Sequence, residues 1–313
     1  MREWGAEPLT DLRAALATAE RGTVVLIADP GQFGAPSPRG VSSDSTRLDV
    51  EELDTAHERG VKIVSLEPLP AALTQLAGAG VKVASGGSGG ASSHNGGEWA
   101  TLAPLSRYRR PLRKLRELLP SLGHARTLSI QTLGTPAHGS LGARLFDAAD
   151  IAITLLGQPE SVHAVFTTPQ VTRGVHAAPP APDHLRGLDG DLTATLRYDG
   201  NRSATITASN RAAHPSLCLT LLAAEASATV TDDRLTVSHT REHAGDRDAP
   251  YPDPERAFAE ALATQLSGYL ASGVGLAGEV DFAATLALAQ AALLSARTGE
   301  PESPAIMLKL AGL

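Results

Sequence analysis

The sequence predicts an α/β domain with a small parallel sheet, followed by an α+β domain whose large, open and mostly antiparallel sheet carries helices on one face. Three observations predict this order. Strand-like and helix-like segments alternate over the first hundred residues, which favours parallel strands joined by helices. From residue 125 onward, strand patterns follow one another with short links, which favours antiparallel pairing. Two helical patterns then close the chain, and we divide it into domains 1–122 and 123–313.

The elements of the first domain are predicted from apolar runs and the residues that interrupt them. Residues 9–19 have helical spacing with Thr10 as N-cap, and the continuous apolar run 23–28 is typical of a strand buried on both faces. Asp29 and Pro30 end that strand, and a segment rich in glycine, proline and serine follows as a loop. The remaining predicted elements are helices at 49–59 and 70–77 and strands at 61–66 and 81–84.

The second domain is predicted from a change in pattern after a basic helix at 107–119. Residues 125–133 form a strand pattern, and residues 141–156 form a helix pattern that ends at Gly157. Hairpin turns are predicted at 199–201 and 232–233. Six further strands are predicted at 161–168, 191–198, 203–209, 216–222, 226–231 and 234–239, and two helices at 253–271 and 281–297, the second with Asp281 as N-cap.

Composition limits the classes of function. A hydrophobic content of 42% supports a sizeable core, and a net charge of −7 argues against nucleic-acid binding through a general basic field. The basic segment 107–116 is interpreted as a solvated helix face, with an anion-binding or partner-binding patch as the alternative. The single cysteine, Cys218, excludes an internal disulfide and lies in an apolar run typical of a buried thiol. Because neither a secretory signal nor an apolar run of about 20 residues is present, we expect a cytoplasmic protein without membrane contact.

Two segments resemble ligand sites by composition but not by context. Residues 86–97 are rich in glycine, yet they match neither phosphate-binding fingerprint in a strand-to-helix setting, so we predict a surface loop. His239 and His243 stand four residues apart, but they follow a strand in a loop-like segment, where that spacing does not place both rings on one face. We therefore predict no metal site.

Several segments, in this order, resemble the Gfo/Idh/MocA oxidoreductases, the relatives of glucose–fructose oxidoreductase and inositol dehydrogenase. The matching segments are 23–30, 50–68, 107–119, 139–157 and 289–301. Segment 50–68 resembles the helix and strand that end in Glu-Lys-Pro in the family, and segment 139–157 resembles the family helix that carries the catalytic aspartate and histidine. The resemblance implies a Rossmann-like nucleotide domain, an NAD(P) cofactor, and a large second-domain sheet that commonly builds the oligomer interface.

The departures from the family pattern concern the cofactor turn and the catalytic positions. Family members begin with a strand, a G-x-G-x-x-G turn and a helix, and nothing at the start of this sequence matches, so we expect a truncated Rossmann-like domain without that first βαβ unit. The catalytic lysine of the family corresponds to Glu67, the helix aspartate to Ala143, and the acid/base histidine to Asp147. Asp150 keeps its family identity. An alanine cannot transfer a proton, and a carboxylate cannot replace a lysine that steadies negative charge.

These departures predict a catalytically degenerate pseudo-oxidoreductase, with no cofactor assigned, that acts as a binding or regulatory partner. The expected partner is a second copy through the large sheet, or a full-length paralogue. The alternative is an active NAD(P)-dependent oxidoreductase on a sugar or cyclitol-like substrate, with the cofactor held by a non-standard or partner-supplied site. In that case Asp29, Pro30, Glu67 and Pro68 are the candidates to line the cofactor cleft.

The carboxylates near the expected cleft allow a further interpretation. Asp147 and Asp150 are the candidates for substrate binding, as the resemblance implies. Glu67 and Asp147 together would form a carboxylate pair for acid/base chemistry on a sugar-like substrate, or for binding a cation or an amino group. We favour the simpler interpretation that both are solvated cleft residues, with Arg144 pairing with Asp147 at the surface.

Overall fold

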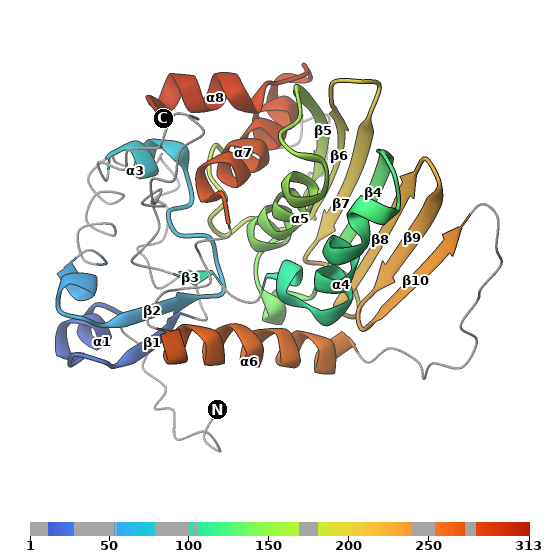
Figure 1. The fold of residues 1–313 in the computed structure, drawn as a ribbon. Coiled ribbons are helices and arrows are strands. Elements are labelled where there is room, and N and C mark those ends of the chain that lie inside the picture. Colours follow the sequence, from blue (N-terminus) through green and yellow to red (C-terminus); the bar gives the residue numbers. More distant parts are fainter. Residues whose placement is uncertain are drawn as a thin grey trace, which may run out of the picture.

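The computed structural model describes residues 12–27, 53, 55–78, 101–102, 105–168, 181–239, 254–272 and 280–313. Within them, a parallel sheet near the N-terminus is followed by a larger, mostly antiparallel sheet with helices, which confirms the predicted fold class (Figure 1). The predictions made for Thr10, Asp29, Pro30 and His243, and for segments 81–84 and 86–97, lie outside the described residues.

The parallel sheet has the order β1 (Val24–Ile27), β2 (Lys62–Ser65), β3 (Thr101–Leu102). Helices α1 (Leu12–Thr18) and α3 (Leu73–Gly78) accompany it. The prediction that β1 is buried on both faces was wrong, because Val24 and Leu26 are 36% and 37% exposed. A continuous apolar run shows that both faces of a strand are apolar, but it does not show that both are covered.

The larger sheet has seven strands in the order β10-β9-β8-β4-β7-β6-β5. β4 (Ala125–Leu133) is central and runs parallel to β7, while every other neighbouring pair in this sheet is antiparallel. The remaining strands are β5 (Ser161–Thr167), β6 (Asp191–Arg197), β7 (Ser203–Ser209), β8 (Ser216–Ala223), β9 (Ala226–Thr231) and β10 (Arg234–His239). The predicted strands and both hairpin turns are confirmed in this part of the chain.

The two faces of the larger sheet differ because apolar and hydroxylated residues alternate along its strands. Inward residues such as Leu128, Ile130 and Leu219 form one core with α5 (Leu141–Leu156) and α7 (Phe282–Thr298). On the other face, the strand register aligns one row of small polar residues across all seven strands. This row consists of His163, Thr195, Thr205, Ser129, Thr220, Thr229 and Thr236, all half-buried or exposed.

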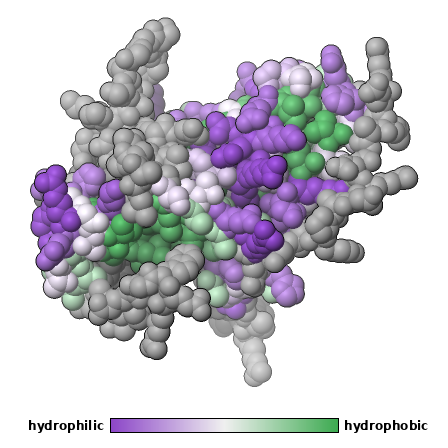
Figure 2. All heavy atoms as spheres, turned by 60° about the horizontal axis from the view of Figure 1, so that its bottom comes forward, coloured by the Kyte–Doolittle hydropathy of each residue, from purple (hydrophilic) through white to green (hydrophobic). Residues whose placement is uncertain are grey.

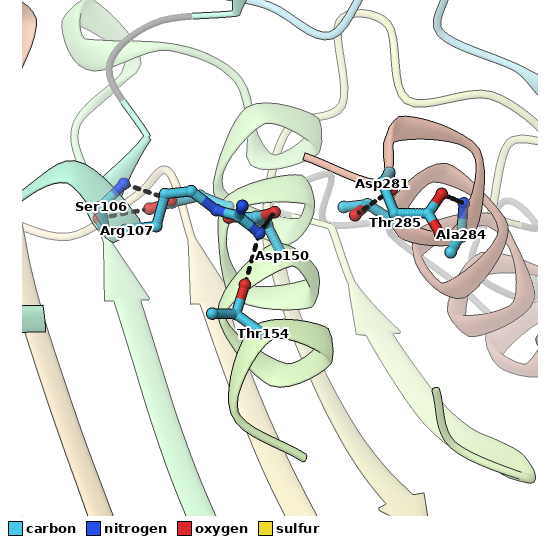
Figure 3. Close-up of polar contacts among 8 residues, drawn as sticks. Ser106, Arg107, Asp150, Thr154, Asp281, Ala284 and Thr285 are labelled. Atoms are coloured by element: carbon cyan, nitrogen blue, oxygen red, sulfur yellow. Dashed lines mark hydrogen bonds and ion pairs between the residues drawn. The ribbon is translucent and has the colours of Figure 1, made fainter. Parts of the chain in front are cut away.

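Helices α6, α7 and α8 lie in the C-terminal part of the chain. α6 (Pro254–Ser272) runs beneath both sheets (Figure 1), where its Leu262 and Leu266 pack on Val64 of β2. Its Gln265 accepts a 2.6 Å hydrogen bond from the backbone N–H of Leu105. α7 begins at the predicted N-cap Asp281, whose carboxylate accepts from the backbone N–H of Ala284 at 3.0 Å (Figure 3). The short α8 (Pro304–Ala311) was not predicted.

The basic segment 107–116 is only partly a solvated helix face. α4 (Arg110–Leu118) does expose Arg110 and Arg113, but Arg107 and Arg109 lie before the helix and are buried, so the prediction was wrong for these two.

On the lower face of the molecule, hydrophilic and hydrophobic residues gather in separate areas (Figure 2). Within the described residues, no helix is long and apolar enough to cross a membrane.

Candidate functional site

Glu67 lies two residues after the end of β2, and its side chain reaches the start of α5. Its backbone N–H donates to the Ser65 hydroxyl at 3.0 Å, which turns the chain at the end of the strand. Its carboxylate accepts the backbone N–H of Ser140 at 2.6 Å and the Ser140 hydroxyl. With 2% of its surface exposed, Glu67 is buried at the carboxyl end of a parallel strand, the edge at which open α/β sheets place their ligands.

Ser140 explains why α5 begins at this point. Its hydroxyl accepts the backbone N–H of Ala143 at 3.2 Å, which satisfies one of the donors that the first helical turn leaves open. The Glu67 carboxylate then lies at the positive end of the helix dipole, where a negative charge is favoured. One serine therefore joins the N-terminus of α5 to the end of β2.

Asp147 lies two turns further along α5 and is held by another serine. Its carboxylate accepts the backbone N–H of Ser106 at 2.7 Å and the Ser106 hydroxyl at 2.6 Å. It is 4% exposed. The interpretation of Glu67 and Asp147 as solvated cleft residues was therefore wrong, because the serines that bind them bring both carboxylates into the interior.

Asp150 forms a buried ion pair with Arg107. Figure 3 shows Arg107 reaching α5 from the segment before α4, with Asp150 and Thr154 on the facing side of the helix. The Arg107 Nε donates to Asp150 at 2.5 Å, and its Nη2 donates to both Asp150 and Thr154. Asp150 is 0% exposed, and this burial raises the pKa of its carboxyl to about 7 although the Arg107 charge acts in the opposite direction. Substrate binding by the Asp150 carboxylate would require this ion pair to open.

Arg144 does not form the expected surface pair with Asp147. It is 7% exposed, and its Nη2 donates to the backbone carbonyl of His138. Its guanidinium lies 5.8 Å from the centre of the Phe258 ring of α6, and its Nε finds no acceptor within the described part of the chain. Burial lowers the pKa of this guanidinium below its ordinary value, against the opposing pull of Asp147.

The remaining predicted site residues contribute little that is reactive. Ala143 lies in the first turn of α5 and carries only a methyl group, while Pro68 is buried after Glu67. Sequence reasoning missed Ser140 and Ser106, the two serines that hold the carboxylates. A serine directly before a helical pattern is an N-cap signal, so Ser140 was within reach of the sequence. Ser106 stands directly before the helix predicted at 107–119 and has the same signal, although the structure places it in a 3-10 turn, Ser106–Tyr108, where its side chain binds Asp147 instead of capping a helix.

The described residues do not fit the anionic groups of a dinucleotide. The carboxyl end of β2 presents the Glu67 carboxylate, and the N-terminus of α5 is already filled by it. A G-x-G-x-x-G string does occur at 273–278, but it follows helix α6 instead of a strand, so it lacks the context of the fingerprint. No cluster of three metal-ligating side chains occurs among the residues that the structure describes.

Comparison with known proteins supports the fold and leaves the activity open. No family model and no curated protein matches the chain. Among solved structures, levoglucosan dehydrogenase in complex with NADH and levoglucosan gives a TM-score of 0.62 at 16% identity, covering 96% of this chain and 86% of that one. The UDP-N-acetylglucosamine 3-dehydrogenase GnnA from Acidithiobacillus ferrooxidans gives 0.56 at 17% identity, covering 98% and 85%.

A third solved structure, an oxidoreductase from Agrobacterium radiobacter in complex with NAD+, L-tartaric acid and magnesium, gives a TM-score of 0.61 at 16% identity, covering 98% and 87%. These neighbours confirm the resemblance noted in the sequence: the chain has the fold of the Gfo/Idh/MocA-type sugar dehydrogenases. At such low identity, the likeness describes the fold alone.

Proposed function

We propose that this protein is a non-catalytic relative of the Gfo/Idh/MocA oxidoreductases that acts by binding instead of hydride transfer. One observation carries the proposal: the residues at the three matched catalytic positions have no free proton-transfer group. Glu67 is bound by Ser140, Ala143 has no ionisable group, and Asp147 is bound by Ser106. A general acid or base must come within about 2.6–3.2 Å of the substrate proton that it transfers. In this structure, both carboxylates instead form hydrogen bonds of that kind with serine donors.

The alternative is an active NAD(P)-dependent oxidoreductase on a sugar or cyclitol-like substrate. It is favoured by the solved neighbours, several of which carry NADH or NAD+ in their complexes. On this alternative, a cofactor would have to be held by a non-standard or partner-supplied site, with Glu67 and Pro68 at its edge. The reaction would also need a proton-transfer group other than Ala143 and Asp147.

Calorimetric titration with NAD(H) and NADP(H), on protein checked for co-purified nucleotide, separates the two. A ligand at 100 times its dissociation constant stabilises a fold by about 2.7 kcal/mol, so a thermal melt provides an independent readout. We expect no heat of binding and no melting shift up to millimolar cofactor. A saturable isotherm would contradict the proposal and favour the active alternative. Levoglucosan dehydrogenase, titrated under the same conditions, is the positive control.

We also propose that the partner is a second copy of this chain, seated on the hydroxyl-rich face of the larger sheet. Seven strands about 4.8 Å apart and about 23 Å long offer about 800 Å², which matches the area that one partner contributes to a standard interface. The row through Thr205 and Thr220 carries no carboxylate, and on this face the described strands place their one carboxylate, Asp191, at the end of β6, so the middle of the face brings no like charges together between two chains of net charge −7.

Light scattering after size-exclusion chromatography tests the dimer. Thr205→Arg, in the middle of the row, is expected to shift the mass to that of the monomer while the circular dichroism spectrum stays unchanged. Glu117→Arg, an exposed change on α4 away from this face, is the matched control and should leave the dimer intact. A monomeric wild-type protein would contradict this proposal and favour a different partner, such as a full-length paralogue.

A further inference from the structure

The contact between Glu67 and α5 has the form of a bound ligand. The carboxylate comes from a position 73 residues away in the sequence. One oxygen accepts the Ser140 backbone N–H and the other accepts the Ser140 hydroxyl. Two donors that face the two oxygens of one carboxylate, at the positive end of a 16-residue helix, define an anion subsite.

A second, independent feature of the same place is the buried cation Arg144. Its Nε has no acceptor within the described residues, and its terminal nitrogen donates to a neutral carbonyl instead of a carboxylate. A Cβ placed on Gly139 would lie 3.5 Å from the Glu67 Oε1 and 3.6 Å from the Arg144 Nη2, so both groups border the same point. The buried positive charge of Arg144 beside the helix N-terminus adds to the preference for an anion there.

We propose that Ser140 and Arg144 form a carboxylate-binding subsite, that Glu67 occupies it as an internal ligand, and that Glu67 thereby blocks it against an external carboxylate. The ligand class is a small carboxylate, either free or as the acid group of a sugar acid. This inference rests on the proposed function, since a site filled by the chain's own side chain does not process a substrate. It also gives a role to the glutamate that stands where the resembling family has a lysine, because the Glu67 carboxylate occupies the N-terminus of α5.

The carboxylate class follows from the number and type of donors. The backbone N–H and hydroxyl of Ser140 satisfy the two oxygens of one carboxylate, whereas a phosphate would bring a third oxygen for which Ser140 has no further donor. A neutral amide of the same shape offers one acceptor oxygen and an NH₂ group, and that NH₂ group cannot accept from Ser140. Acetate and acetamide therefore form a matched pair of probes.

Chemical rescue tests the subsite. Glu67→Ala removes the internal carboxylate and opens space for one of about the size of acetate. For a dissociation constant of about 10 mM, 100 mM acetate would lower the unfolding equilibrium constant of this variant about tenfold, a rise in melting temperature of about 3 °C. Acetamide, or chloride at matched ionic strength, should give no such rise. Wild-type protein should not respond to acetate, because Glu67 already fills the subsite.

The double variant Glu67→Ala with Ser140→Ala is the matched control and should lose the acetate response. An equal response to acetate and chloride in Glu67→Ala, or a response that persists without the Ser140 hydroxyl, would overturn the proposal. If Glu67→Ala does not fold, the cycle of Glu67→Gln, Ser140→Ala and their double variant decides the question. Losses that simply add would overturn it, and a double variant no worse than the poorer single variant would support it.

The same proteins keep this inference separate from the proposed function. NADH binding by wild-type protein would overturn the proposed function, and the acetate titration of Glu67→Ala would then decide the subsite independently. NADH binding by Glu67→Ala without any acetate response would overturn the subsite, because a dinucleotide presents phosphates and a neutral carboxamide instead of the carboxylate that the subsite binds. A Glu67→Ala variant that binds neither acetate nor NADH would overturn the subsite and leave the non-catalytic proposal intact.

Discussion

Gly142, in the first turn of α5, packs so closely against the segment 181–188 that one methyl group should destabilise the protein. A Cβ at this position would lie 2.8 Å from the carbonyl carbon of Leu185 and closer still to its oxygen. Ordinary contact begins at 3.4 Å, and the carbonyl oxygen is the nearest atom, so it would have to move away by about 1.4 Å. The backbone of Gly142 is otherwise helical, and there alanine is normally preferred over glycine by about 1 kcal/mol.

Leu185 has little freedom to move. Its side chain is fully buried, and its N–H donates to the carbonyl of Ala71 at 2.9 Å, in the chain that follows Glu67. Overpacking costs about 1–3 kcal/mol, and a clash with backbone falls at the upper end of that range. After subtracting the gain in helix propensity, we expect Gly142→Ala to lose about 2 kcal/mol, or about 4–8 °C in melting temperature.

Urea unfolding followed by circular dichroism measures this loss. Ala143→Gly, the reverse change at the next position, calibrates the propensity contribution and should itself cost about 1 kcal/mol. The reasoning is refuted if Gly142→Ala is as stable as wild type or more stable. Such a result would mean that segment 181–188 gives way at almost no cost and that the start of α5 is not fixed by this contact.

Three further predictions concern buried polar groups. Asp147→Ala should lower the free energy of unfolding by about 1–3 kcal/mol in urea titration, because the Ser106 N–H is left unsatisfied. Ser106→Ala should cost much less in the Asp147→Ala background than in the wild type, because the bond is already lost. Arg107→Met should cost about 3–5 kcal/mol by leaving Asp150 unpaired, and adding Asp150→Leu should recover part of the loss, whereas additive losses would contradict a coupled pair. Burial raises the pKa of the Tyr198 hydroxyl, which has no hydrogen-bond partner among the described residues, so the stability it contributes is present below pH 10 and is lost as the pH rises above the ordinary value. In a pH titration followed by absorbance at 295 nm, Tyr198 should ionise only when the protein unfolds, and the Tyr198→Phe variant should lack this delayed phase. Ionisation of Tyr198 near its ordinary pKa in the folded wild type would refute this.

The larger sheet could be predicted from the sequence because its signals are local. The boundaries predicted for β4, α5, β7, β9 and β10 agree with the structure residue for residue. Alternating apolar residues mark which strand face turns inward, and Ser140 and Gly157 sit at the two ends of α5 as caps. Such patterns depend only on neighbouring residues, so the sequence predicts the bounds of these helices and strands without knowledge of distant contacts.

The partners of the site residues could not be predicted, since each contact joins segments that are far apart in the sequence. Glu67 meets Ser140 across 73 residues, and Ser106 meets Asp147 across 41. A charged residue in sequence is expected to be solvated unless a partner is known, so burial of Glu67 and Arg107 contradicts the usual rule. Only tertiary packing supplies the donors that make this burial tolerable.

The polar groups that α5 turns inward bind segments that precede it in the chain. Ser140 takes the carboxylate at the end of β2, while Asp147 and Asp150 take the donors of Ser106 and Arg107 ahead of α4. The resemblance implies that this stretch of the helix would carry the groups that meet a substrate. Here Ser140 joins α5 to the end of β2, whereas Asp147 and Asp150 join it to the segment before α4. A ligand that binds one of these three carboxylates would therefore have to displace its serine or arginine donor and leave a buried polar group without its partner, at a cost of about 1–3 kcal/mol.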